Sequence, residues 1–327
     1  MFFCYVPDPQ PKQPEGQQAP SAAAGRASTA RRSGAAACTA ADAGAGGAGA
    51  AGGGAAARHT PSILHARTWR CLPAGSMSAR VLIAGIGGVG GALARRLARK
   101  GVSVHLVARS GDKLAALRAE LGGGGAHAIT VADAAHPEAF EAAVREAVGA
   151  APLAALVYAI GSIPLKPLKT TSAADFSAAF DANFTSGALA LRAAAGALAG
   201  GGAGGAPGAA VFFSTVAARV GFPNHAAIAA AKGGVEAFVR AAGAELAPAV
   251  RVNALAPSLS DTPLAARFTA SEATKKALGD AHPLPRLGSA AEIAALADFL
   301  LDSDASGWVS GQVWAIDGGR STLRPKN

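Results

Sequence analysis

From Arg80 to the C-terminus, short apolar segments alternate with longer segments that have helical periodicity. The apolar segments are rich in Val, Ile and Ala, as expected of strands buried on both faces of a sheet. Parallel strands need crossover connections, which helices supply, so the alternation predicts a three-layer α/β domain around a doubly wound parallel sheet. The predicted strands are residues 81–85, 102–109, 128–133, 153–161, 209–215, 250–257 and 312–319, and the predicted helices are residues 91–101, 112–122, 137–149, 173–199, 225–248 and 290–302.

Residues 1–78 have a different composition, dominated by Ala, Gly, Pro, Ser, Gln and Arg. Such a segment buries too little apolar surface to offset its chain entropy, which predicts a disordered leader before a single domain over residues 79–322. Arginines in an acid-poor background rich in Ala and Ser are typical of an organelle transit peptide, with a plastid favoured over a mitochondrion. The alternative is translation from Met77, which would give a shorter cytoplasmic protein.

Composition argues against several function classes. From Arg80 onward, 23 Lys and Arg oppose 18 Asp and Glu without forming a basic stripe, so we expect no nucleic-acid partner. No apolar run reaches the roughly 18 residues of a membrane span, so we expect no membrane partner. The three cysteines (Cys4, Cys38 and Cys71) precede the domain and the histidines lack ligand spacing, so we expect no metal site.

The first chemical signal is a glycine pattern directly after the first predicted strand. Gly85, Gly87 and Gly90 form G-x-G-x-x-G ahead of the first predicted helix. Glycine permits a tight turn and close backbone approach, and a helix N-terminus offers N–H groups and a positive dipole to a pyrophosphate. This context predicts a Rossmann-type fold that binds a dinucleotide at the carboxyl ends of its strands.

The end of the second predicted strand bears on which dinucleotide binds. NAD-specific folds of this type place Asp or Glu there to bond the ribose 2′-hydroxyl, whereas this chain has Arg109 and Ser110. No carboxylate repels a 2′-phosphate at this point, and Arg109 is able to pair with one. We therefore expect NADP(H) to be preferred over NAD(H). The alternative interpretation is that Arg109 is an ordinary surface arginine.

Over residues 79–320 the chain resembles the short-chain dehydrogenase/reductase family. The resemblance rests on AAAKGGVEAF, on VRVNALAPSLSDTPL, and on the C-terminal segment HPLPRLGSAAEIAALADFLLDSDASGWVSGQVWAIDGG. It implies a single-domain oxidoreductase that uses a nicotinamide cofactor. The residues implied for cofactor binding are Asp133, Ala159, Gly161, Lys232, Pro257 and Thr262, together with Gly85, Gly87, Gly90, Arg109 and Ser110.

The resemblance gives these residues separate roles. Asp133 would contact the adenine, and Pro257 and Thr262 would lie near the nicotinamide carboxamide. Lys232 would bond the nicotinamide ribose. The sequence Tyr-Ala-Ile-Gly over residues 158–161 stands where the family has Asn-Asn-Ala-Gly, a recognisable but altered version.

The implied catalytic residues are incomplete. The family's acid is a Tyr four residues before the Lys, with a Ser thirteen residues before that Tyr, and this chain has Ile228 and Thr215 at those positions. Thr215 keeps a hydroxyl that can bond a carbonyl oxygen, and Asn183 matches the Asn that holds a proton-relay water. Ile228, however, has no proton to donate, so the family mechanism cannot run unchanged.

His225 is one candidate for the missing acid. It lies seven residues before Lys232, the spacing at which the enoyl-acyl-carrier-protein reductases of the same family place their Tyr. An ordinary His pKa of about 6.5 suits proton transfer near neutrality. The alternative is a loop histidine that caps the helix predicted over residues 225–248.

Two functions remain open. The first is an NADP(H)-dependent oxidoreductase acting on a small carbonyl, alcohol or enoyl compound. The second, favoured by Ile228, is a catalytically silent dinucleotide-binding sensor or scaffold. The predicted substrate loop, residues 260–283, indicates an apolar pocket through Leu264, Ala265, Phe268 and Leu278.

The resemblance also implies a homodimer or homotetramer. The contact would form through the helices predicted over residues 173–199 and 225–248, whose many Ala residues permit close packing. The Ala bias of the whole chain is the alternative explanation for these small residues.

Overall fold

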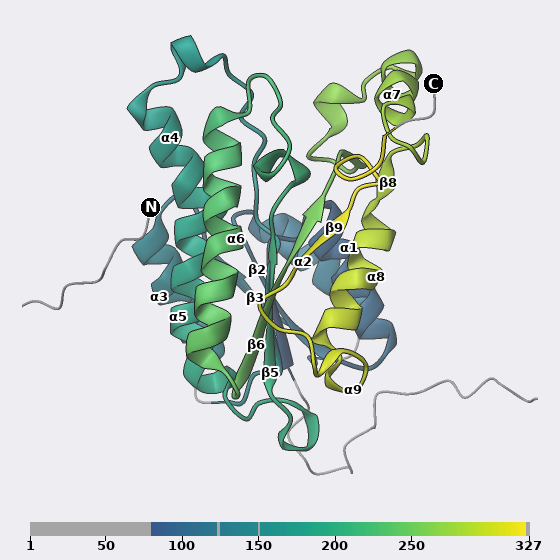
Figure 1. The fold of residues 1–327 in the computed structure, drawn as a ribbon. Helices are drawn as coiled ribbons and strands as arrows, with labels where there is room; N and C mark the ends of the chain where they lie inside the picture. Colours follow the sequence, from purple (N-terminus) through teal and green to yellow (C-terminus); the bar gives the residue numbers. More distant parts are fainter. Residues whose placement is uncertain (1–79, 123–124, 150, 325–327) are drawn as a thin grey trace, which may run out of the picture. The chain divides into compact units, whose positions relative to one another are not determined.

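In a computed structural model that describes residues 80–122, 125–149 and 151–324, a central sheet lies between layers of helices (Figure 1). Its seven parallel strands have the order β3-β2-β1-β4-β5-β6-β9. The order reverses direction between β1 and β4, which is the switch point where ligands bind in doubly wound sheets. The predicted α/β fold is therefore confirmed. The strands are β1 (Arg80–Ala84), β2 (Ser103–Ala108), β3 (Ala128–Val131), β4 (Ala155–Tyr158), β5 (Gly208–Phe213), β6 (Val250–Pro257) and β9 (Val313–Ile316).

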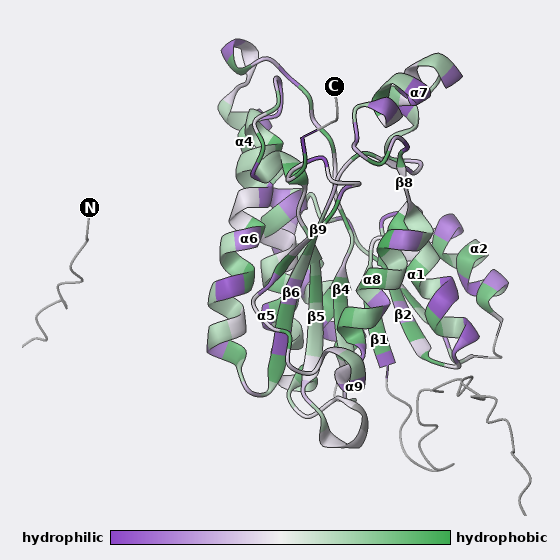
Figure 2. Cartoon of the chain, turned by 45° about the vertical axis from the view of Figure 1, so that its right-hand side comes forward, coloured by the Kyte–Doolittle hydropathy of each residue, from purple (hydrophilic) through white to green (hydrophobic). Residues whose placement is uncertain are grey.

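Most residues of the central strands are coloured hydrophobic in Figure 2. Their side chains are buried alternately on the two faces of the sheet. Along β1, Leu82 and Ala84 join one apolar cluster, and Val81 and Ile83 join the other, as the period-two alternation of a strand requires. Helices cover both faces (Figure 1). On the first face lie α3 (Pro137–Val148), α5 (Ser186–Leu198) and α6 (Ala226–Leu246), and on the second α1 (Gly88–Arg99), α2 (Gly111–Leu121) and α8 (Ala290–Leu301).

The predicted helix over residues 173–199 is wrong in one respect, because it is interrupted. α4 (Ala173–Phe180) and α5 are joined by a π-helical segment, Asp181–Thr185. The Asn183 side chain donates from Nδ2 to the carbonyl of Ala179 at 2.9 Å, taking the acceptor that an α-helix would offer to the Asn183 backbone. Single π-turns of this kind often lie at functional sites.

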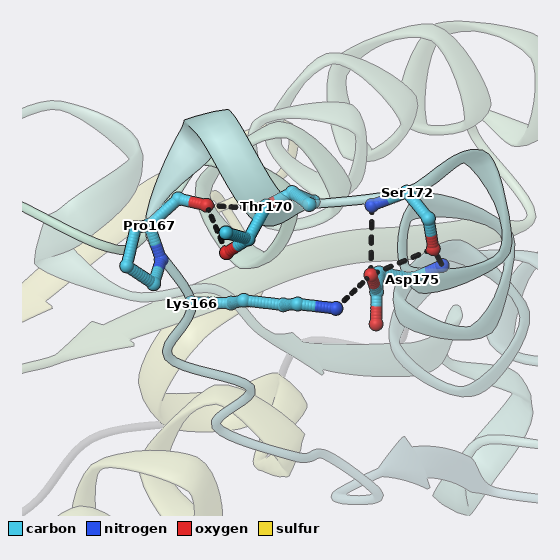
Figure 3. A network of polar contacts seen from close by, with 6 residues as sticks. Lys166, Pro167, Thr170, Ser172 and Asp175 are labelled. Atoms are coloured by element: carbon cyan, nitrogen blue, oxygen red, sulfur yellow. Dashed lines mark hydrogen bonds and ion pairs between the residues drawn. The ribbon is translucent and has the colours of Figure 1, made fainter.

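A polar network fixes the start of α4 (Figure 3). Ser172 and Asp175 form a capping box, in which each side chain bonds the other residue's backbone N–H. Lys166 adds an ion pair to Asp175 at 2.6 Å, and the hydrogen bonds and the ion pair hold the pKa of that carboxyl well below its usual range. The segment after β4 is thus tied to the helix that leads to Asn183.

The remaining elements are short, and most of them lie in loops near the carboxyl ends of the strands. Beyond the main sheet are the two-stranded pair β7 (Ser260–Asp261) and β8 (Gly288–Ser289), the helices α7 (Glu272–Asp280) and α9 (Ser303–Ser306), and the 3-10 turns η1 (Leu168–Thr170), η3 (Ala203–Gly205), η4 (Val216–Ala218) and η5 (Ala266–Phe268). Within the described ranges no helix is long and apolar enough to cross a membrane. Likewise, no group of His, Cys, Asp and Glu there has the arrangement of a metal site.

The predicted leader, residues 1–78, and Met77 lie outside the described residues. The transit peptide and the boundary at residue 79 therefore stay predictions. Inside the domain the element ends shift by a few residues: α1 begins at Gly88 rather than at residue 91, and β4 is shorter than the predicted strand over residues 153–161.

Candidate active site

The glycine loop connects β1 to α1 and comes very close to the segment after β4. Gly85 has φ +93°, and a Cβ there would lie 2.7 Å from the carbonyl carbon of Ala159. A Cβ on Gly90 would lie 1.8 Å from the carbonyl oxygen of Gly85. Both positions therefore require glycine for backbone reasons.

Gly87, by contrast, faces open space, since a Cβ at this N-cap residue would meet nothing within 4 Å. The first turn of α1 carries no acidic side chain that would offset the positive end of the helix. Open space in front of free backbone N–H groups suits a pyrophosphate. The loop therefore fits the dinucleotide that its spacing predicts.

The adenosine side of the predicted site lies after β2 and β3. Arg109 is exposed and forms no ion pair with any other described residue. Ser110 caps α2 and its Oγ accepts from the Lys113 backbone N–H at 3.4 Å. Asp133 accepts from the Ala135 backbone N–H at 3.0 Å. The Arg109 guanidinium is thus free to meet a charged ligand group.

Asn183 and Lys232 meet at Gly161, three residues beyond β4. A Cβ on Gly161 would lie 3.4 Å from Asn183 Oδ1 and 3.6 Å from Lys232 Nζ. Lys232, on α6, is 6 % exposed. Burial lowers the pKa of the Lys232 ammonium to about 8. Lys232 Nζ forms no hydrogen bond or ion pair with another described residue, which leaves the ammonium available to a ligand.

Ser162 belongs to the same cluster, although the sequence reasoning missed it. Its backbone N–H donates to Asn183 Oδ1 at 3.0 Å, and its hydroxyl accepts from Asn183 Nδ2 at 2.9 Å. The two bonds fix the Asn183 amide beside the glycine. The signal was available, because Ser162 directly follows the altered Tyr-Ala-Ile-Gly motif.

Thr215 lies two residues beyond the end of β5 and caps η4. Its Oγ1 accepts from the Ala217 backbone N–H at 3.3 Å, which leaves the hydroxyl proton for donation to a ligand. The neighbouring Ser214 is turned into the core, where it donates to Glu236 at 2.9 Å. Glu236 also pairs with Arg219 at 3.1 Å. Of the two adjacent hydroxyls, only that of Thr215 is left without a core carboxylate partner.

Ile228 lies on α6 four residues before Lys232, on the same face of the helix, and it is 4 % exposed. Tyr158, the other candidate for a phenol, is in the core. Its hydroxyl donates to the carbonyl of Ala182 at 2.7 Å, and burial raises the pKa of Tyr158. Within the described domain, no tyrosine therefore stands in for the missing acid.

His225 lies at the start of α6, close to Phe222. Its Nδ1 is 2.7 Å from the carbonyl oxygen of Pro223, and its ring centroid is 5.5 Å from that of Phe222. Nδ1 therefore carries a proton that it donates to the loop, and Nε2 remains as the second ring nitrogen. The His225 ring forms no hydrogen bond with Lys232 or Thr215.

The segment after β6 brings the substrate loop to the glycine loop. Thr262 touches the start of α1, since a Cβ on Gly88 would lie 2.7 Å from Thr262 Cγ2. Pro257 ends β6 just before this segment. His282, near the end of the loop, bonds Ser258 through Nε2 at 2.8 Å. The loop is thus anchored at both ends beside the predicted cofactor site.

The substrate loop is less uniformly apolar than the sequence suggests. Leu264 is 49 % exposed, whereas Ala265 is buried. Phe268 packs against the Arg267 guanidinium, whose carbon lies 4.5 Å from the ring centroid. The loop therefore presents charge as well as apolar surface.

Comparison with known proteins agrees with this geometry. A family profile described as enoyl-(acyl carrier protein) reductase matches residues 83–321. An uncharacterized oxidoreductase of Mycobacterium tuberculosis is 34% identical over 242 residues, covering 73% of this chain and 90% of the relative. Galactitol 2-dehydrogenase (L-tagatose-forming) of Cereibacter sphaeroides is 34% identical over 233 residues, covering 71% and 90%. The crystal structure of 3-ketoacyl-(acyl-carrier-protein) reductase from Brucella melitensis complexed with NADH superposes with a TM-score of 0.66 at 28% identity, covering 74% of this chain and 98% of that one.

Proposed function

This chain belongs to the short-chain dehydrogenase/reductase family of oxidoreductases, and we propose that it reduces a small carbonyl or enoyl compound with NADPH through an altered proton-donating site. One observation carries the proposal. Asn183 Oδ1 and Lys232 Nζ both face Gly161, 3.4 and 3.6 Å from where its Cβ would lie. The amide and the ammonium of the family's relay are thus kept together although its tyrosine is not.

The cofactor would be held by four groups of residues. The N–H groups at the start of α1 would bind the pyrophosphate, Asp133 the adenine, and Lys232 the nicotinamide ribose, with Pro257 and Thr262 near the carboxamide. The bound cofactor supplies the hydride in reduction and accepts it in oxidation. Ala159 and Gly161 would form the floor between these groups, because the Ala159 backbone lies against Gly85 and Gly161 borders Asn183 and Lys232.

Cofactor choice would depend on the residues after β2. Arg109 is exposed and has no carboxylate partner in the described chain. A guanidinium matches a phosphate with two parallel hydrogen bonds, so Arg109 favours NADP(H) over NAD(H). Calorimetry of both cofactors with the unmodified protein tests this preference, and equal affinity would contradict it.

Charge that develops on the substrate oxygen would be met by Thr215. Its hydroxyl proton is uncommitted because Oγ1 already accepts from Ala217. The proton itself would come from the Lys232 ammonium, whose pKa burial lowers to about 8. An acid with a pKa near the working pH transfers its proton more readily than an ordinary lysine would. Asn183 and Ser162 would position the relay that recharges Lys232.

His225 is the second candidate for the proton source. Its Nδ1–H is held by the Pro223 carbonyl, so only Nε2 could serve, and only in the imidazolium form. If Lys232 is the acid, the rate of reduction should fall as the pH rises through about 8.

The catalytically silent alternative is favoured by one observation, the buried Ile228 where the family has its acid. The test is NADPH oxidation by the purified domain with a panel of aldehydes, ketones and enoyl thioesters, in the unmodified protein and in Ile228→Tyr. Turnover in the unmodified protein supports the proposal. Tight NADPH binding with no turnover in either protein would favour the sensor or scaffold role instead.

We further propose that residues 1–78 direct import into an organelle, with a plastid preferred. The arginine-rich, acid-poor composition supports this. Fluorescent fusions of the full chain and of the chain from Met77 separate the possibilities. Diffuse cytoplasmic signal from both would contradict the import role.

Self-association through α5 and α6 is a further proposal. Both helices are rich in Ala and Gly, and small residues allow close helix packing. Light scattering of the purified domain at micromolar concentration should give the mass of a dimer or tetramer. A monomer under these conditions would contradict the assignment.

A further inference from the structure

Arg267 links the substrate loop to the segment that follows β4. Its Nη2 donates to the carbonyl oxygen of Ile163, which lies two residues beyond the glycine that borders Asn183 and Lys232. The residue belongs to η5, more than a hundred positions further along the chain. The guanidinium therefore stands at the mouth of the site rather than on an unrelated surface.

Two contacts hold the Arg267 side chain, the bond to Ile163 and the ring of Phe268. Its guanidinium carbon lies 4.5 Å from the centroid of the Phe268 ring, so the aromatic face orients the planar group. The residue is exposed. Apart from the bond to Ile163, its N–H groups have no acceptor in the part of the chain that the structure describes. An oriented, accessible fork with free donors is suited to a planar anion.

Arg320 repeats this arrangement on a second segment, the one that follows β9. Its Nη1 donates to the carbonyl of Ala281, at the end of the substrate loop. Its guanidinium carbon lies 5.7 Å from the centroid of Phe222, whose ring is next to His225 at the start of α6. Arg320 thus approaches the same group of loops from the other end of the substrate loop. It too forms no ion pair among residues 80–324 that are described.

The carboxylates around these loops are already occupied. Asp175 pairs with Lys166 at 2.6 Å (Figure 3), and Asp261 pairs with Lys275 at 2.6 Å. Asp317 accepts from the Ser321 hydroxyl at 2.5 Å and from two backbone N–H groups. None of these three acids forms an ion pair with Arg267 or Arg320.

We propose that Arg267, assisted by Arg320, binds an anionic group of the carbonyl substrate, a carboxylate or a phosphate ester. This rests on the proposed function for the reaction itself and adds the substrate class. The charge is separate from the cofactor's predicted 2′-phosphate contact, because Arg109 follows β2 whereas Ile163 follows β4, two strands away in the sheet. The substrate would lie with its carbonyl toward Thr215 and its anionic end toward the loop.

Three para-substituted benzaldehydes test the proposal, since they share the reacting aldehyde and differ in charge: 4-formylbenzoate, its methyl ester, and 4-formylphenyl phosphate. With NADPH, kcat/KM for at least one anion should exceed that for the ester by about tenfold or more. Arg267→Gln should abolish this preference while changing the ester's kcat/KM by less than about threefold. Arg118→Gln is the matched control, because Arg118 is an exposed arginine on α2, outside the substrate loop. This variant should change neither the preference for the anions nor kcat/KM for the ester.

The two anions distinguish a carboxylate site from a phosphate site. Arg267→Lys keeps the positive charge but loses the planar fork. If the side chain recognises the anion by its charge, this variant should keep part of the preference for the anionic aldehydes that Arg267→Gln loses. Equal kcat/KM for the ester and both anions in the unmodified protein would overturn the proposal. An equal loss for all three aldehydes in Arg267→Gln would also overturn it, since Arg267 would then act only by holding the loop.

Ligand-observed NMR makes the result independent of turnover. Without NADPH, 4-formylbenzoate or 4-formylphenyl phosphate should show saturation transfer from the unmodified protein and lose it in Arg267→Gln. Binding of this kind with no turnover of any aldehyde would contradict the proposed reductase function but keep the anion site. Turnover of the neutral ester with no anion binding would support the reductase function but contradict the anion site.

Discussion

Replacing Lys232 by Met should stabilise the folded domain at neutral pH. The side chain is 6 % exposed, and burial lowers the pKa of its ammonium from 10.5 to about 8. At about 1.4 kcal/mol per pH unit, this costs the folded protein about 3 kcal/mol near pH 7. Met has a similar length and no charge, so Lys232→Met should recover most of that free energy.

The gain must depend on pH in one direction. The folded domain releases the Lys232 proton near pH 8, whereas the unfolded chain keeps it up to about pH 10.5. Between these values the unfolded state binds more protons, so the free energy of unfolding of the unmodified protein rises with pH. The advantage of Lys232→Met should therefore be full below pH 8 and fall to about 1 kcal/mol by pH 10.

Urea unfolding followed by circular dichroism, without cofactor, at pH 7 and pH 10 measures this advantage. In thermal unfolding at pH 7, the Tm of Lys232→Met should also exceed that of the unmodified protein by about 6–12 °C, at about 2–4 °C per kcal/mol for a domain of this size. Lys169→Met, at an exposed position, is the control and should stay within about 0.5 kcal/mol. A variant less stable than the unmodified protein at pH 7, or an advantage that is equal at both pH values, would refute the reasoning.

Four other changes have definite expected outcomes. Arg109→Asp should reverse the cofactor preference measured by calorimetry, because it removes a charge-assisted bond and adds repulsion, each worth about 1–3 kcal/mol. Thr215→Val should lower kcat by about 10²-fold or more, as loss of an oxyanion donor does, whereas His225→Ala should do so only if His225 is the acid. Gly90→Ala should abolish NADPH binding in a fluorescence titration, because the new Cβ would lie 1.8 Å from the carbonyl oxygen of Gly85.

The sheet and the glycine turn between β1 and α1 were predictable because they depend on local pattern. Buried parallel strands read as continuous apolar runs, and the glycine spacing fixes a turn at a known edge. The spacing from Lys232 back to Ile228 and Thr215 follows from one helix and one strand end. In the structure Ile228 and Lys232 lie one turn apart on α6, and Thr215 follows the end of β5.

The interruption of the helix at Asn183 could not be predicted from local pattern. It depends on the Asn183 amide competing for the Ala179 carbonyl, and on the Tyr158 hydroxyl bonding the carbonyl of Ala182. The Tyr158 contact crosses from β4 to the π-helical segment. A helical periodicity over residues 173–199 carries no information about such a contact.

The arginines at the mouth of the site were missed for a related reason. Arg267 and Ile163 are 104 residues apart in sequence, and in a loop no periodicity indicates which backbone carbonyl a guanidinium reaches. An arginine in a predicted surface loop reads as a solvated charge until its partner segment is known. Ser162 is different, since it adjoins a recognised motif and only its side-chain partner was hidden.

Ile228 and the lowered pKa of Lys232 have a common physical basis. The two side chains lie one helical turn apart on α6, and both are buried. A phenol at position 228 would offer the ammonium a polar neighbour, whereas a sec-butyl group adds to the desolvation that disfavours charge. The isoleucine thus helps to move Lys232 toward the pKa range in which an ammonium donates a proton near neutral pH. The about 3 kcal/mol that this costs the fold is of the size that active sites commonly sacrifice in stability. A chain that had lost both catalysis and cofactor binding would have no reason to keep a buried lysine at that cost.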